Sequence, residues 1–151
     1  MTARTEELVH PKQEPTFLPL TVGVARSAAT EQADHARREP AGEVWRRAEE
    51  ADSAAAGCWA ALLGGCDSAE RKSLPARLRA LAEATTGYVG QRWWLGHGSA
   101  LRRRVAEAQL RINDAVREGD GAEFAEAFVG YDQAIATAVV SVQSRLESPT
   151  P

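Results

Sequence analysis

The sequence has few residues of the kinds that bind metals or form disulfides. Cys58 and Cys66 are the only cysteines among 151 residues, and there are three histidines. The spacing of the cysteines matches no zinc motif, and no two histidines are separated by the short intervals of paired metal ligands. We therefore expect reduced thiols and no metal site, because a chain of this length can bury a sufficient core without either kind of cross-link.

The chain also lacks a long apolar run. No segment approaches the roughly 20 apolar residues that cross a bilayer, so we expect no membrane insertion. Residues 17–25 are apolar enough to suggest a short signal sequence, but the segment before them is rich in proline and has more acidic than basic residues. That composition argues against secretion and favours a cytoplasmic protein. Abundant alanine, with 16 arginines against two lysines, indicates a GC-rich bacterial genome.

Motifs of catalysis and cofactor binding are missing as well. Gly96-His97-Gly98 lacks the third glycine and the preceding strand of a dinucleotide-binding loop, and neither lysine follows a glycine as in a P-loop. No carboxylate or histidine has a catalytic partner that the sequence identifies. The chain is therefore predicted to be non-enzymatic and to hold no cofactor.

Helical periodicity, in contrast, is abundant. Apolar residues recur at intervals of three and four in residues 101–115 and again in 124–142, which places each series on one face of a helix. Between them, Gly119 supplies the left-handed residue that ends a helix, and Asp120 is predicted to cap the next one. Ser99 is predicted to cap the first. This short connection predicts a long antiparallel helical hairpin at the end of the chain.

Three more helices are predicted upstream. A broad apolar stripe predicts a core helix over 41–63, closed by a Gly-Gly pair. Pro75 fits the first position of the next helix. Thr30 is predicted to cap a short helix that Pro40 ends.

Together these elements predict an all-α fold, a bundle of four principal helices with one or two short ones. The bundle is predicted to be a single domain over 27–147, followed by a disordered tail at 148–151. Residues 1–26 lack helical period and contain three prolines, so they are predicted to be an extended, partly disordered arm. Its 17–22 segment is expected to lie against the bundle or a partner.

The last helix has apolar residues on two opposite faces. Ala125, Val129, Ala136 and Val140 lie opposite the stripe that faces the hairpin. Either the helix is central in a monomeric bundle, or its second face meets another protein or a second copy. The candidate interface residues are Phe17, Leu18 and Leu20 of the arm, with Val129, Ala136 and Val140 of the helix.

Basic residues are concentrated in one block. Residues 71–104 hold eight basic residues and one acidic residue, in a chain with a net charge of -3. A glycine-rich segment in this block leads into a helix start, where the helix dipole disfavours cations. A bound anion or nucleic acid would offset that cost. The candidate site comprises Arg92, Trp93, Trp94, His97, Ser99, Arg102, Arg103 and Arg104. Alternatively, the tryptophans pack into the bundle and the arginines pair with acidic helices.

Three functions remain open. The first is a protein-interaction module, acting as an adaptor, regulator or assembly component, with another protein or a second copy as its partner. The second is binding of nucleic acid or a phosphate ligand by the basic block, which the overall acidity, with a pI near 5.7, disfavours. The third is a small-ligand pocket between helices lined by Trp45, Trp59 and Trp93. The missing catalytic motifs and the two-faced last helix favour the first.

Overall fold

The computed structural model describes residues 15–32, 34–65 and 68–147. Within these ranges it contains six α-helices and no strand, which confirms the predicted all-α class. The helices are α2 (Pro19–Glu31), α3 (His35–Gly64), α4 (Ala69–Val89), α5 (Gln91–Leu95), α6 (Ser99–Glu118) and α7 (Gly121–Glu147). None of these helices is long and apolar enough to cross a membrane. The predictions for residues 1–14, for Cys66 and for the tail at 148–151 lie outside the described residues.

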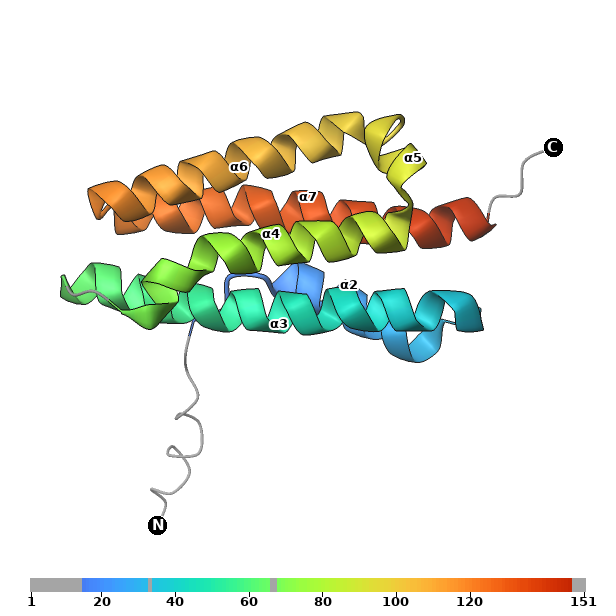
Figure 1. The fold of residues 1–151 in the computed structure, drawn as a ribbon, viewed down its shortest axis with the longest axis horizontal. Coiled ribbons are helices and arrows are strands. Elements are labelled where there is room, and N and C mark those ends of the chain that lie inside the picture. The colour runs from blue at the N-terminus through green and yellow to red at the C-terminus, as the bar shows by residue number, and fades with distance from the viewer. Residues whose placement is uncertain (1–14, 33, 66–67, 148–151) are drawn as a thin grey trace, which may run out of the picture.

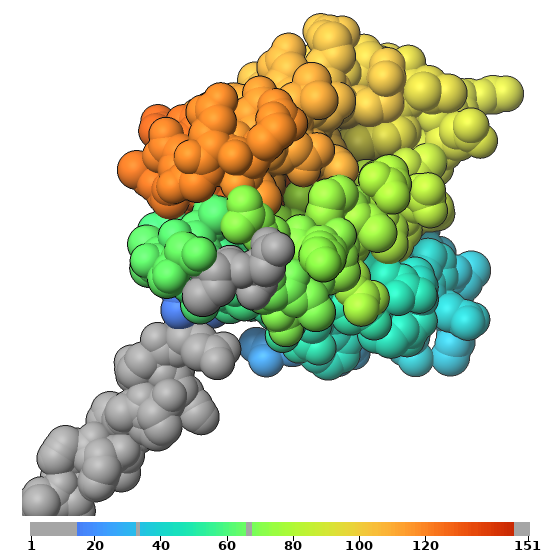
Figure 2. All heavy atoms as spheres, turned by 60° about the vertical axis from the view of Figure 1, so that its left-hand side comes forward, coloured from blue at the N-terminus to red at the C-terminus, as the bar shows by residue number. Residues whose placement is uncertain are grey.

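Two antiparallel helix pairs form the body of the molecule (Figure 1). α3 packs along α4, and α6 packs along α7, while α4 also contacts both α6 and α7 and so joins the pairs. On the face shown in Figure 2, the atoms of α4 separate those of α3 from those of α6. α2 packs on α3 and α7. The largest fully buried side chains come mainly from α4 and α7 and include Tyr131, Phe124, Phe128, Leu74 and Leu78.

The connection between α6 and α7 has the local geometry that its sequence predicts. Gly119 is left-handed, with φ 69°, and its N–H bonds to carbonyls of the last turn of α6. The Asp120 carboxylate accepts a hydrogen bond from the Glu123 N–H at 3.1 Å. Both contacts satisfy backbone groups that the helix ends would otherwise leave unpaired.

The start of α6 differs from the prediction. Ser99 is the first helical residue rather than the cap, and the preceding Gly98 offers no side-chain hydrogen bond. A Cβ at Gly98 would lie 2.5 Å from the Trp93 ring, so this position requires glycine. The Gly98 N–H donates to the Trp93 carbonyl at 2.7 Å. The close packing of this turn on Trp93 therefore excludes a side-chain cap there.

The structural roles predicted for two prolines are wrong. α3 begins at His35 under an Asp34 cap and continues through Pro40, and α4 begins after a Ser68 cap and continues through Pro75. Each proline lies in the second turn of its helix and removes one backbone hydrogen bond there. The extensive packing of α3 along α4 compensates for that loss.

The predicted extended conformation of residues 17–22 is also wrong. Phe17 and Leu18 are buried in the core, and α2 begins at Pro19, which takes the favourable first position of a helix. The periodicity was too weak to indicate this helix because the residues that it buries, Thr21 and Ala25, are small. The chain joins the bundle from Phe17 onward.

Candidate functional site

The two tryptophans of α5 are engaged within the protein. Trp94 is buried, and half-buried Trp93 stacks on it with ring centroids 6.4 Å apart and an interplanar angle of 23°. The Arg145 guanidinium of α7 lies over the Trp93 ring, 4.7 Å from its centroid. Stacking of a nucleobase on either indole would have to displace one of these contacts.

The basic block divides into two parts. In α4, Arg71 donates to the Val116 carbonyl at 3.0 Å, and Arg77 lies 3.5 Å from the Glu50 carboxylate. At the start of α6, Arg102 donates through Nε to the Trp94 carbonyl at 3.4 Å. Arg103 and Arg104 are exposed and form no salt bridge with any residue of the described part. Arg92 and His97 are exposed as well, and Ser99 is half-buried.

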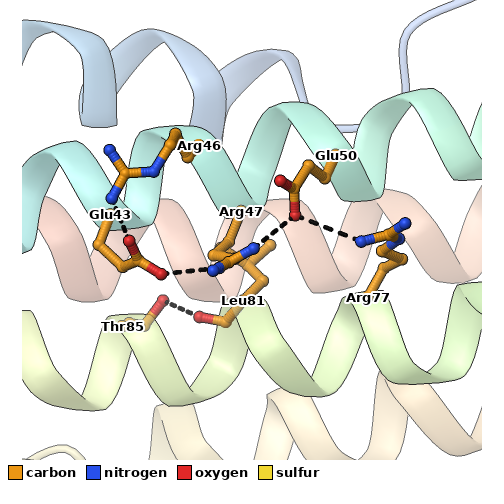
Figure 3. Close-up of polar contacts among 7 residues, drawn as sticks. All are labelled: Glu43, Arg46, Arg47, Glu50, Arg77, Leu81 and Thr85. Atoms are coloured by element: carbon orange, nitrogen blue, oxygen red, sulfur yellow. Dashed lines mark hydrogen bonds and ion pairs between the residues drawn. The ribbon is translucent and has the colours of Figure 1, made fainter.

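Ion pairs connect α3 with α4 (Figure 3). Arg47 lies between two carboxylates, 2.7 Å from Glu43 and 2.8 Å from Glu50, and Glu50 also faces Arg77 of α4. Glu43 pairs with Arg46 as well. Hydrogen bonds from Arg46 and Arg47 lower the pKa of the Glu43 carboxyl. These groups are partly or fully exposed and neutralise one another, which is typical of a structural surface network rather than a catalytic site.

Carboxylates from other helices hold the N-terminus of α2. Asp52 of α3 accepts from the Phe17 and Leu18 N–H groups at 2.7 and 3.0 Å. Asp132 of α7 accepts from the Leu20 and Thr21 N–H groups at 3.0 and 2.8 Å and is only 3 % exposed. α2 has no side-chain cap of its own, so these carboxylates satisfy its first amides and complement its dipole.

The role of Asp132 could have been inferred from its surroundings in the sequence, although the helical periodicity did not indicate it. Asp132 is the only charged residue between positions 127 and 144. A single carboxylate in an apolar helix is either exposed or paired with donors from another element. The start of α2, which has no side-chain cap of its own, is where the amides that need this acceptor lie.

The predicted interface residues fall into two groups. Phe17, Leu18 and Ala136 are buried and belong to the core rather than to an interface. Leu20, Val129 and Val140 remain exposed, at 49 %, 56 % and 48 % of their surface. The second apolar face of α7 is therefore covered in part by α2 and free in part.

Two hollows flank Leu20 on this side of the molecule. A cavity of about 650 Å³ lies between α2 and α7 and is lined by Leu20 and Val140. A second, of about 440 Å³, is lined by Leu20 and Val129. Both also contact Pro19.

The pocket predicted from three tryptophans does not form. Trp45 lines a separate depression with the start of α3, whereas Trp59 packs on Phe17 at 5.7 Å between ring centroids. Trp93 lies under Arg145. Trp45 and Trp59 are 14 residues apart on one helix, or ~21 Å, so the three indoles line different surfaces.

Groups with nucleophilic potential are buried and unactivated. Burial raises the pKa of the Cys58 thiol, which reduces the thiolate fraction needed for reaction. Burial also raises the pKa of the Tyr131 hydroxyl, which donates to the Leu78 carbonyl at 2.9 Å. In the described ranges, no three His, Cys, Asp or Glu side chains are grouped so as to hold a metal ion.

Comparison of the chain with protein-family models, with curated proteins and with solved structures finds no match. What the protein does must therefore follow from its own surface. That surface offers two features, the apolar face of α2 and α7 and the exposed arginines at the start of α6.

Proposed function

We propose that this chain is a non-enzymatic protein-interaction module that docks through one face of the bundle. This docking face consists of Leu20 on α2 and the exposed side chains of α7 from Val129 to Val140. The observation that carries the proposal is the exposure of Leu20, Val129 and Val140, each about half accessible, beside the two hollows. Large apolar side chains grouped around hollows are typical of interaction sites.

The absence of charge on this face supports the proposal. Between positions 127 and 144, the exposed residues of α7 are uncharged: Val129, Gln133, Thr137, Val140, Gln143 and Ser144. Charged residues make up 26 % of the chain, so an uncharged outer stripe of this length departs from the rest of the surface. Charge is depleted at the centres of interfaces because desolvating it is costly.

The occupant that we favour is a second copy of the chain. Leu20 projects beside a hollow on each side. A projection next to a hollow is self-complementary about a two-fold axis between them, because each copy inserts its projection into the smaller hollow of the other and leaves the larger one open. An uncharged face also brings no like charges together across such an axis.

The test is the mass of the protein in solution, measured by sedimentation equilibrium over a range of concentrations. Wild-type protein should form dimers, and Val129→Glu should be monomeric with an unchanged circular dichroism spectrum. Leu110→Glu is the matched control, since Leu110 is 64 % exposed on α6 and lies away from the docking face. A wild-type protein that is monomeric at all concentrations would contradict the proposal that a second copy binds the docking face. Loss of helix in Val129→Glu would show that this face belongs to the core.

A second candidate function is the binding of nucleic acid or another polyanion by the start of α6. It is supported by the exposure of Arg103 and Arg104, which have no salt-bridge partner among the described residues. Unpaired arginines over the first turn of a helix are an electrostatic target for phosphate.

A further inference from the structure

The larger hollow has an apolar body and one polar end. α2 and α7 supply its apolar walls, which include Leu20, Val24, Ala28, Val139 and Val140. Its polar end is formed by Glu31 and Gln32, Tyr88 of α4 and Gln143. The ends of α2, α4 and α7 and the beginning of α3 meet at this side of the bundle, on the right in Figure 1. A cavity of about 650 Å³ with this division matches an elongated molecule with one polar head.

Gln32 presents an unsatisfied donor at the polar end. The residue is only 8 % exposed. Its Oε1 accepts from the Asp34 N–H at 3.3 Å, which fixes the orientation of the amide. Its Nε2 is shielded from solvent and makes no hydrogen bond of ordinary distance and angle with the described residues, although the side chain lies near enough to the Tyr88 hydroxyl to lower the pKa of that group. Buried donors are nearly always paired, so a ligand oxygen at this end of the cavity would supply a missing acceptor.

Guanidinium groups lie near the same end, behind the residues that line the cavity. Arg145 donates to the carbonyl of Val89, next to Tyr88, at 3.0 Å, and burial together with nearby Arg37 lowers the pKa of Arg145. Burial raises the pKa of the Tyr88 hydroxyl, and Gln32, Arg37 and Arg145 partly offset that rise. Arg37 of α3, Arg145 of α7 and the Gln32 amide between α2 and α3 thus lie around the Tyr88 hydroxyl.

The acidic groups nearby neutralise only part of this cluster, which has three guanidinium groups against two carboxylates. Asp34 lies 3.4 Å from the Arg37 Nε, within the same turn. Glu31 is exposed and is the one charged residue that lines the cavity. Arg38, which donates to the Gln32 carbonyl at 2.7 Å, adds a third guanidinium. An anionic head group would therefore meet an excess of donors and of positive charge.

We infer that this cavity binds a medium-chain carboxylate, with its apolar chain between α2 and α7 and its carboxylate at Gln32 and Tyr88, beside Arg37 and Arg145. The inference goes beyond the proposed docking function. The cavity shares Leu20 and Val140 with the docking face, so the variants that test it leave both residues unchanged.

The first test is calorimetric titration of the full chain with decanoate below its critical micelle concentration. Decanol and decyltrimethylammonium serve as neutral and cationic comparisons with the same apolar chain. Decanoate should bind at one site, at least tenfold more tightly than either. Equal binding of all three would overturn the head-group assignment, and absence of decanoate binding would overturn the site.

The second test fills the cavity with a side chain. Gly23 lines the cavity, and a Cβ there would meet nothing within 4 Å. Gly23→Leu should weaken decanoate binding at least tenfold. Gly87→Leu is the matched control, because Gly87 is also a helical glycine with open space but does not line the cavity. Both variants should fold, since leucine favours helix more than glycine does. Unchanged binding in Gly23→Leu would place the ligand elsewhere.

The third test supplies the carboxylate from the chain itself. Gln32→Glu should raise the melting temperature, because the new carboxylate lies beside Arg37 and Arg145, and it should abolish decanoate binding. Gln109→Glu on α6 controls for the added charge. A melting temperature that falls in Gln32→Glu alone would contradict an anion-binding cluster.

Discussion

The two helices of the C-terminal hairpin have similar apolar inner faces, but their outer faces differ in charge. Inside, α6 and α7 pack along each other through apolar stripes. Outside, α6 exposes charged residues along its length, namely Arg103, Arg104, Glu107, Arg111, Asp114 and Arg117. The exposed residues of α7 between 127 and 144 carry no charge. The buried apolar stripes determine how the two helices pair. The exposed residues distinguish the charged, solvated surface of α6 from the uncharged surface of α7, which is suited to contact with another molecule.

The difference follows from position in the bundle. α6 packs mainly on α7, so its remaining surface faces water. α7 contacts α2, α3, α4 and α6, and even its polar residue Asp132 serves a neighbouring helix. α7 therefore has little free surface, and what remains between positions 127 and 144 is the uncharged stripe.

The largest loss of stability is expected from the shared inner face. Phe128 is buried and lies 5.0 Å from Phe124 and 5.4 Å from Phe17 between ring centroids. Phe128→Ala should lower the free energy of unfolding by about 3–5 kcal/mol, since it leaves a cavity in the core. Urea denaturation measures this change. If Phe128→Ala lowered the free energy of unfolding only as much as a substitution at an exposed site, such as Leu110→Ala, the aromatic cluster would not be the core of the bundle.

A smaller loss is expected where α7 holds α2. Asp132→Ala should cost about 2–4 kcal/mol, because it leaves the buried Thr21 amide and the part-buried Leu20 amide without an acceptor. Asp132→Asn keeps one carbonyl oxygen and should cost less. Hydrogen exchange should locate the increased opening of Asp132→Ala in α2 and not in α6. Uniform loss of protection across all helices would contradict the capping role.

The outer face of α6 should tolerate substitution. Replacing Arg103 and Arg104 together with Gln should change stability by no more than about 0.5 kcal/mol. If this surface binds nucleic acid, the same double variant should weaken binding and flatten its dependence on salt concentration. Fluorescence titration with a short oligonucleotide at two ionic strengths measures both. Identical titrations for wild type and variant would exclude these arginines from any such site.

The smallest effect is expected in the ion pairs of α3. Arg46 and Arg47 lower the pKa of the Glu43 carboxyl below its ordinary value of 4.5, so its pairing stabilises the fold above that pH and is lost as the pH falls through the lowered pKa. Glu43→Gln should therefore reduce stability slightly at pH 7 and not at pH 2. Urea midpoints at the two pH values test this. An equal reduction at both would point to lost packing instead of lost charge.

Local patterns were sufficient to predict α6, α7 and their connection. The apolar intervals, Gly119 and Asp120 depend only on residues a few positions away. The local sequence is therefore sufficient to predict the helices and the turn between them. The end of α3 at Gly64 followed in the same way, since left-handed Gly65 caps it through local carbonyls.

Features that depend on distant residues were not predictable from those patterns. Local rules predicted that Pro40 ends a helix and that Pro75 begins one, but the contacts between α3 and α4 outweigh those rules and both prolines lie inside helices. The placement of Trp93 depends on Arg145, more than 50 residues away in the chain. The polar end of the larger hollow joins residues of α2, α4 and α7 with Gln32 from the connection between α2 and α3, and helical periodicity does not indicate that these residues lie together.

The way in which α2 is capped has a consequence for the order of folding. The acceptors of its first amides lie 35 and 111 residues away, on α3 and α7. Until those helices are in place, the start of α2 has free amides and a short chain of small residues with little tendency to form a helix alone. Substitutions in α2 should therefore accelerate unfolding while leaving the folding rate nearly unchanged. In kinetic terms, we expect α2 to be the last helix to form and the first to be released.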